Sequence, residues 1–217
     1  QLLIIFIPVG TVVFILRSWS LDWINSLHAI GRMLIQLIII AYFLTFLFST
    51  NNSIITLLIL VSMVFVASWI ALGTVSKDRI KLLKTVFISI LFGGGIALFL
   101  VTQFVLKLDP WYMPRYMIPI AGMVFASSMN GVSLAAERLK AELERNISYD
   151  KAKSIALKAS LIPITNSLFA VGLVSLPGMM TGQILSGISP HIAIRYQIMV
   201  MCMICLLYTS DAADDGH

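Results

Sequence analysis

The stretch "MLIQLIIIAYFLTFLFSTNNSIITLLILVSMVFVASWIALGTVS", from Met33 to Ser76, contains no charged residue. Its apolar run is divided once, by the polar cluster "STNNS" at Ser49–Ser53, whose composition favours a short turn. Each half is long enough for a helix of about 20 residues, which is the length that crosses a bilayer. The stretch therefore predicts two membrane-spanning helices joined by a turn.

The rest of the composition agrees with a membrane protein, because 59% of the 217 residues are hydrophobic and only 12% are charged. Further runs without Asp, Glu, Lys or Arg are Gln1–Leu16, Thr85–Leu106, Tyr116–Ala136, Ala159–Ile194 and Tyr196–Tyr208. We expect an all-α, polytopic transmembrane helix bundle of about seven spans. Residues 1–208 should form a single transmembrane domain whose first and last spans are truncated, and "TSDAADDGH" at 209–217 should be a non-native or disordered tail.

The sixth expected span is too long for one simple helix and contains "VGLVSLPGMMTGQILSG", Val171–Gly187. Pro177 and Gly178 are expected to break it, and non-helical backbone at membrane depth is tolerated where protein or a watery cavity satisfies it. This predicts a substrate pathway. The alternative is a tight turn with a packing face, since Gly178 and Gly182 would let another helix approach closely. Polar side chains expected in the same pathway are Ser127, Ser128, Asn130, Thr165, Asn166, Thr181 and Gln183.

Basic residues predict the orientation, because Lys and Arg near span ends favour the cytoplasm. With seven spans, twelve of the fifteen fall on one side, which places the N-terminus outside and the C-terminus in the cytoplasm. The net charge of +5 then describes a cytoplasmic face, and no nucleic-acid partner is expected. The twelve are Arg17, Arg32, Lys77, Arg79, Lys81, Lys84, Arg138, Lys140, Arg145, Lys151, Lys153 and Lys158.

Two cytoplasmic segments are more than short turns. Arg17–Arg32 is expected to be either a helix lying in the membrane interface or a Trp-anchored connector. Glu137–Ser160 is predicted to form helix, turn and helix, with the Glu142–Arg145 pair supporting the first helix. Ser148 is the expected N-cap of the second helix, with Asp150 in its first turn.

Motifs for catalysis or nucleotide binding are absent from the sequence, so we expect neither an enzyme nor a bound cofactor. Every charged residue maps to a loop or a span end, which predicts that energy for any transport comes from outside this chain. Cys202 and Cys205, with Met residues between and beside them, would suit a soft ion such as Cu(I). Ordinary packing of an apolar helix is the alternative.

Three blocks carry a resemblance to a known family: Gly31–Phe48, "MIPIAGMVFASSMNGVSLAAERL" at Met117–Leu139, and "GLVSLPGMMTGQILSGISPHIAIRYQIMVM" at Gly172–Met201. They resemble the FetB-type ABC transporter permeases, a family that includes a proposed bacterial iron exporter and plant permeases linked to aluminium tolerance. The resemblance covers about Leu2 to Met203. It implies a permease in the bacterial inner membrane that works with a separate ATP-binding subunit. We expect a homodimer that moves a small ion or metal, with iron export as the suggested activity.

A permease without its own nucleotide site must receive force through a surface contact, and Glu137–Ser160 is the longest cytoplasmic segment. Within it, Ile147 and Tyr149 are the expected anchors, while Arg145, Lys151 and Lys153 are expected to support or steer the contact. Two other functions stay open: a self-contained secondary transporter or channel, and a membrane assembly protein that transports nothing.

The orientation can be tested by cysteine labelling in a background without Cys202 and Cys205. A cysteine that replaces Asn52 should react with a membrane-impermeant thiol reagent added outside intact cells, and one that replaces Asp78 should react only after permeabilisation. The reverse pattern would overturn the orientation and the loop assignments that depend on it.

Overall fold

The computed structural model describes residues 6–19, 23–49, 52–75 and 79–209 of the chain. This part is helical, and its only strand-like pairing is an isolated bridge between Val171 and Ser175. The all-α fold class is thus confirmed. The helices are α1 (Phe6–Ser18), α2 (Trp23–Ser49), α3 (Ser53–Ala71), the 3-10 turn η2 (Leu72–Thr74), α4 (Arg79–Phe99), the π-helix η4 (Leu100–Val105), α5 (Pro114–Glu144), α6 (Tyr149–Ala170), α7 (Gly178–Leu185) and α8 (Pro190–Thr209).

Five helices of the described chain are long and apolar enough to cross a membrane, which confirms a polytopic membrane protein. They are α2, α3, α4 with η4, α5 and α8. Among the described residues, the helices at the other two expected spans do not combine the required length with the required apolar composition. In α1, 13 residues are described. In α6, charged residues occupy the first half, and the uncharged part, Ala159–Ala170, is about 18 Å long, whereas the hydrocarbon core is about 30 Å thick.

The chain forms two compact units, residues 1–51 and 52–217. In the first unit α1 packs on α2, and the Arg17 guanidinium lies 5.5 Å from the centre of the Trp23 ring. The expected interfacial helix at Arg17–Arg32 is therefore wrong as one element: α1 ends at Ser18, α2 begins at Trp23, and part of the segment, 20–22, lies outside the described residues. The residues from Trp23 to Arg32 instead form the first part of α2, which is one of the candidate spans.

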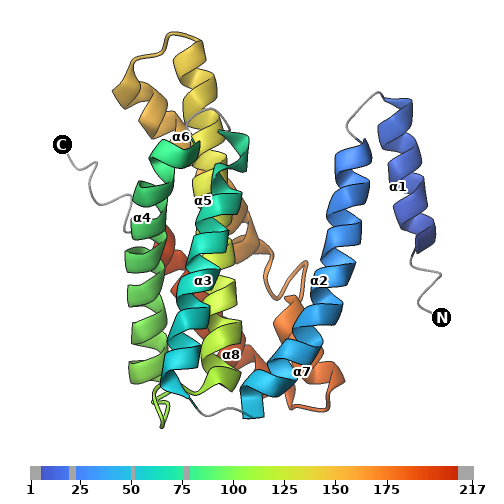
Figure 1. Cartoon of the computed structure of the whole chain (residues 1–217), viewed down its shortest axis with the longest axis vertical. Coiled ribbons are helices and arrows are strands. Elements are labelled where there is room, and N and C mark those ends of the chain that lie inside the picture. The colour runs from blue at the N-terminus through green and yellow to red at the C-terminus, as the bar shows by residue number, and fades with distance from the viewer. Residues whose placement is uncertain (1–5, 20–22, 50–51, 76–78, 210–217) are drawn as a thin grey trace. The chain divides into compact units, whose positions relative to one another are not determined.

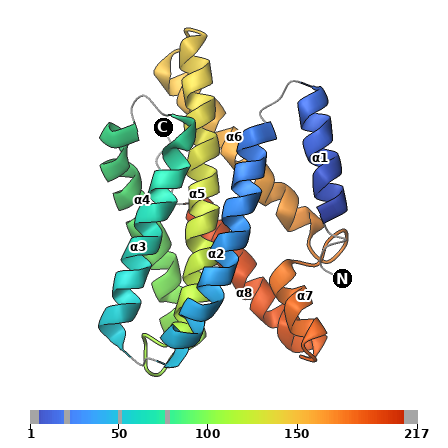
Figure 2. The ribbon, with the colours of Figure 1, turned by 45° about the vertical axis from the view of Figure 1, so that its right-hand side comes forward.

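The second unit is a bundle around α5, which packs against α3, α4, α6 and α8. Figures 1 and 2 both show α3, α4 and α5 side by side, with the turn between α5 and α6 projecting beyond the neighbouring ends of α3 and α4. The core of this unit takes apolar side chains from four helices, among them Val64, Ile90, Val124 and Met203. Asn52 is the N-cap of α3, where its side chain accepts a hydrogen bond from the Ile54 N–H at 2.9 Å, while residues 50 and 51 of the expected turn lie outside the described residues.

The contact between α4 and α5 depends on one glycine. A Cβ atom added to Gly94 would lie 2.9 Å from Cε1 of Phe125 and 3.1 Å from Cγ1 of Val124, closer than carbon atoms normally approach. At the neighbouring Gly93, an added Cβ would meet nothing within 4 Å. Gly94 therefore sets the distance between the two helices, and Gly93 does not.

Both ends of α4 are fixed by specific contacts. At its start, the Arg79 guanidinium lies 3.8 Å from the centre of the Trp69 ring, and Nε donates to the Trp69 carbonyl at 3.1 Å. This satisfies a carbonyl in the last turn of α3, which an α-helix leaves without a partner. At its end, η4 widens the helix, and the Leu106 N–H donates to the Val101 carbonyl five residues back at 2.9 Å.

Alanine substitutions at Gly93 and Gly94 should show which of the two glycines limits the distance between α4 and α5. Gly94→Ala should destabilise the protein by about 1–3 kcal/mol, because it overpacks the α4–α5 contact. Gly93→Ala should be neutral or slightly stabilising, because Ala has the higher helix propensity and its methyl group meets open space. Thermal unfolding of the two variants in the same detergent measures the difference, and equal midpoints would show that the close contact does not limit stability.

Candidate functional site

The turn between α5 and α6 confirms the helix, turn and helix predicted for Glu137–Ser160. Asn146 adopts the left-handed conformation with φ of 59°, its N–H donates to the Leu143 carbonyl at 3.0 Å, and the Ile147 N–H donates to the Glu142 carbonyl at 3.2 Å. These are the two hydrogen bonds of a Schellman motif, in which Asn takes the place that Gly most often holds. The turn therefore has a defined backbone geometry.

A buried carboxylate reinforces this turn. The Glu142 side chain is only 5% exposed, and its Oε1 lies 2.7 Å from Nη2 of Arg138 and 3.5 Å from Nη1 of Arg145. The predicted Glu142–Arg145 pair is present, and Arg138 adds a second, shorter contact from one turn earlier. Two guanidinium groups within ion-pair distance thus compensate the charge of this buried acid and link it to Arg145, the residue that follows α5.

The residues after the turn differ in exposure. Ser148 occupies the N-cap position of α6, as predicted, although its side chain makes no capping hydrogen bond, and Asp150 lies in the first turn. Tyr149 is 60% exposed, whereas Ile147 is half-buried. Leu143, in the last turn of α5, is also an exposed apolar side chain. The prediction that Ile147 and Tyr149 anchor a partner subunit stays a prediction.

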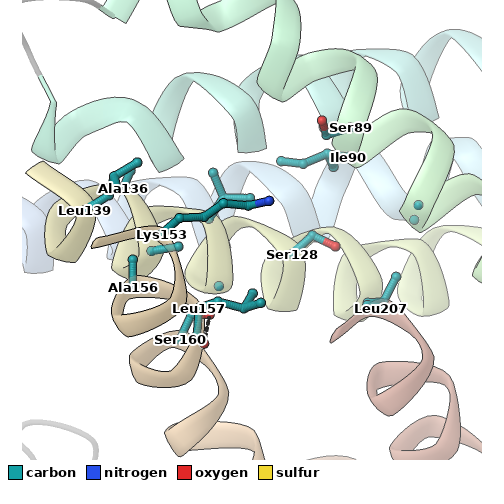
Figure 3. A pocket seen from close by; sticks show the side chains of 15 residues that line it. Ser89, Ile90, Ser128, Ala136, Leu139, Lys153, Ala156, Leu157, Ser160 and Leu207 are labelled. Carbon is teal, nitrogen blue, oxygen red and sulfur yellow. Dashed lines mark hydrogen bonds between the residues drawn. The ribbon is translucent and has the colours of Figure 1, made fainter. Parts of the chain in front are cut away.

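A cavity of about 410 Å³ lies below the turn, between α4, α5, α6 and α8. Figure 3 shows the Lys153 side chain extending along it, with its nitrogen on the side of the cavity where Ser89 and Ser128 lie. The lining residues are Ser89, Ile90, Gly93, Gly94, Ser128, Gly131, Val132, Ala135, Ala136, Leu139, Lys153, Ala156, Leu157, Ser160 and Leu207.

The cavity is polar at a few points and otherwise built from small or apolar groups. The Ser160 hydroxyl donates to the Leu157 carbonyl at 2.8 Å. Within the described chain, no acidic residue, histidine or cysteine lines this cavity. Lys153 was expected to steer a partner subunit, and its place in the cavity was missed. The sequence does contain a signal for this placement, which is the helical spacing i, i+3 and i+7 of Lys153, Ala156 and Ser160. This spacing places the three residues on one face of a helix.

Of the ten predicted pathway residues, Ser128 lines this cavity and the others lie elsewhere. Ser127, beside it on α5, is half-buried, and Asn130 is exposed. Thr165 and Asn166 are exposed on α6, where the Thr165 hydroxyl donates to the Leu161 carbonyl at 3.0 Å. The structure therefore does not gather the predicted polar groups around one space.

The break after α6 is present, but it begins earlier than predicted. Helix α6 ends at Ala170, and Gly172 takes a positive φ of 82° in the turn that follows. Pro177 immediately precedes α7, a position that tolerates proline because its missing N–H would have no helical partner. The predicted break in the sixth span is thus confirmed, but it covers residues 171–177, so that Pro177 is its last residue and Gly178 begins the next helix.

Helix α7 carries the remaining predicted pathway residues. An added Cβ at Gly178 or Gly182 would meet nothing within 4 Å, so the described chain places no helix against these two glycines. The Thr181 hydroxyl donates to the Leu176 carbonyl at 3.2 Å. Oε1 of Gln183 is buried and has no hydrogen-bond partner in the described part of the protein.

A second cavity, of about 780 Å³, lies between the end of α6, α7 and α8. Its wall includes both cysteines, Met180, Met201 and the buried Gln197. No group of three or more His, Cys, Asp or Glu side chains that could hold a metal occurs among the described residues. Metal binding at Cys202 and Cys205 stays a hypothesis.

The long apolar helices, the charged helix-turn-helix and the cavity beneath it define a polytopic helical membrane protein with an ordered element at one end of its bundle. The chain belongs to the family described as "Uncharacterised protein family (UPF0014)", whose model matches residues 1–210.

Similar proteins are found in bacteria and plants. A UPF0014 membrane protein of Synechocystis is 36% identical over 92% of this chain and 83% of the relative. The "Probable iron export permease protein FetB" of Escherichia coli is 37% identical over 83% of this chain and 74% of the relative. "Protein ALUMINUM SENSITIVE 3" of Arabidopsis thaliana is 32% identical over 90% and 78%, respectively. No solved structure matches the chain. The resemblance to this permease family is confirmed.

The buried carboxylate can be tested by hydrogen exchange. Glu142→Ala should speed exchange of the Asn146 and Ile147 amides severalfold, because it removes the ion pairs with Arg138 and Arg145, and ion pairs with partly exposed partners stabilise by up to about 1 kcal/mol. Glu144→Ala removes an exposed carboxylate from the same turn of α5 and should change exchange little. Equal protection in the two variants would contradict a bracing role for Glu142.

Proposed function

We propose that this protein is the membrane permease subunit of an ABC transporter and that it receives its energy from a separate ATP-binding subunit. The proposal rests on family membership and on the Escherichia coli relative, which is named as a probable permease. The sequence has no nucleotide-binding motif of its own. Force must then enter through a surface of this chain.

The observation that carries the proposal is the projecting turn between α5 and α6. Helix α5 has 31 residues and is about 47 Å long, whereas the hydrocarbon core is about 30 Å thick. A helix of this length can carry its charged end beyond the hydrocarbon core, and Figure 1 shows that end projecting past the neighbouring ends of α3 and α4. The Schellman motif and the Glu142 ion pairs give this end a fixed shape, and a rigid element is what a mechanical contact between subunits requires.

Family membership is also the basis on which we propose a cargo and an assembly. A small ion or metal is the proposed cargo, and iron export is favoured because the bacterial relative is named for it. A homodimer in the bacterial inner membrane, with its N-terminus outside, would use the apolar exterior of the bundle. Leu173 and Val174, 89% and 85% exposed, lie in the turn after α6 and would face lipid or a second subunit.

The cavity beneath the turn is the proposed cytoplasmic part of the transport route. It is lined by α4, α5, α6 and α8, and α5 and α6 also form the projecting turn. A movement of the turn would therefore change the width of the cavity directly. The predicted pathway residues of α6 and α7 would belong to a more distant part of the route.

The test is co-purification of an ATP-binding cassette protein from native membranes with this chain as the bait. Tyr149→Ser should leave the protein in the membrane fraction and reduce recovery of the ATPase at least tenfold, because it removes the exposed aromatic anchor. Tyr149→Phe keeps the ring and should retain the partner. Full recovery of the ATPase with Tyr149→Ser would show that the exposed ring of Tyr149 does not hold the partner. Transport by the purified chain without any ATPase would instead favour a secondary transporter or channel.

A further inference from the structure

We propose that the cavity between the end of α6, α7 and α8 binds an uncharged lipid alcohol, a molecule with a long apolar chain and one hydroxyl group, and that this hydroxyl pairs with the Gln197 amide. The cavity and the amide both belong to the second unit. This ligand is separate from the proposed cargo, and its binding does not depend on an ATPase or on transport.

The buried amide of Gln197 is the observation that points to a ligand. The residue is only 5% exposed, and its Oε1 has no hydrogen-bond partner in the described part of the chain. A buried polar atom without a partner costs free energy, so native proteins nearly always satisfy it through protein, water or ligand. Gln197 lies on α8 and lines the cavity. A group that enters the cavity can therefore supply the missing partner.

The wall around Gln197 is mostly apolar. It includes Leu168 from α6, Met180 from α7, and Ile194 and Ile198 from α8. A buried water molecule needs two to four polar partners, and apolar cavities stay dry. The volume of about 780 Å³ lies in the range of small-molecule sites. A molecule with an apolar body and one polar group thus fits this cavity better than water does.

Depth and charge restrict the ligand to an uncharged one. Helix α8 is a candidate span over Pro190–Leu207, and Gln197 lies about two turns, or about 10 Å, after Pro190. This places the amide within the apolar part of the span. Within the described chain, no charged side chain lines the cavity. A charged headgroup at this depth would lose its hydration without gaining an ion partner, so a neutral lipid is favoured.

A hydroxyl group matches the amide better than other neutral lipid groups do. It donates and accepts, so it can donate to Oε1 of Gln197, whereas ethers and esters only accept. Ile198, in the wall one residue further along α8, is 59% exposed. The cavity is therefore open to the surface of the second unit, and a lipid can enter it from the side.

The experiment is photoaffinity labelling of the purified full chain in phosphatidylcholine nanodiscs. The probe is an oleyl alcohol analogue with a diazirine in its chain, and mass spectrometry should find the crosslinks within residues 168–180 and 194–206. Unlabelled oleyl alcohol should compete about tenfold better than oleyl methyl ether, which has the same chain and cannot donate. Oleate should compete no better than the ether, because it is charged.

Two glutamine variants separate the amide from the apolar wall. Gln197→Met keeps the length of the side chain and should reduce the advantage of the alcohol over the ether to less than about twofold. Its thermal midpoint should equal or exceed that of the wild type, because an unpartnered amide is no longer buried. Gln103→Met is the control, since Gln103 lines a different cavity and its Nε2 donates to the Thr102 hydroxyl at 3.3 Å. Competition in this variant should match the wild type.

Three results would overturn the inference. The first is an absence of saturable labelling at these peptides, as expected if a second copy of the chain covers the cavity. The second is equal competition by the alcohol and the ether in the wild type, which would show that the cavity holds lipid chains without recognising the hydroxyl. The third is a marked loss of thermal stability in Gln197→Met, which would place the partner of the amide within the protein.

Discussion

The close approach of α4 to α5 is the constraint on which the second unit depends. Helix α5 packs against α3, α4, α6 and α8, so its position relative to α4 fixes the distances of the whole bundle. Gly94 allows that approach, because any side chain there would meet Phe125 and Val124. Between lipid-exposed helices the hydrophobic effect adds little, and close van der Waals contact through small residues supplies much of the stability. The cavity borders the same contact, since Gly94 is among its lining residues.

Sequence reasoning predicted the class of fold and most helices because bilayer length and charge placement are strong signals. The break after α6 was placed at Pro177 because proline disrupts helix interiors. In the structure Pro163 lies inside α6, whereas Pro177 precedes a helix, where proline fits. Proline alone thus does not fix a boundary. The first residue of the break, Val171, carries no local signal, and the glycine that adopts a positive φ is the next one, Gly172.

The candidate site was predictable in its outline and not in its details. The charge pattern of Glu137–Ser160 predicted two helices and the Glu142–Arg145 pair, because i,i+3 neighbours meet on any helix surface. Burial of Glu142 depends on how α5 packs on α6, which no local pattern contains, whereas the helical spacing of Lys153, Ala156 and Ser160 already places these three residues on one face of α6. Polar residues such as Asn166 were grouped by hydropathy alone, and tertiary packing distributes them over different faces. Ser128 lines the cavity, whereas Ser127 and Asn130 on the same helix do not.

The π-helix at Leu100–Val105 has a consequence for how this protein can change in evolution. Its wide turn holds one residue more than an α-helix would, and Thr102 lies wholly buried there with its hydroxyl donating to the Leu98 carbonyl at 2.8 Å. Loss of one residue would convert the turn to regular α-helix, and the residues beyond it would face nearly the same way, because the wider turn accommodates the additional residue. The body of α4, including Gly94, would keep its register. A single-residue deletion can therefore be absorbed at this point while the bundle stays the same.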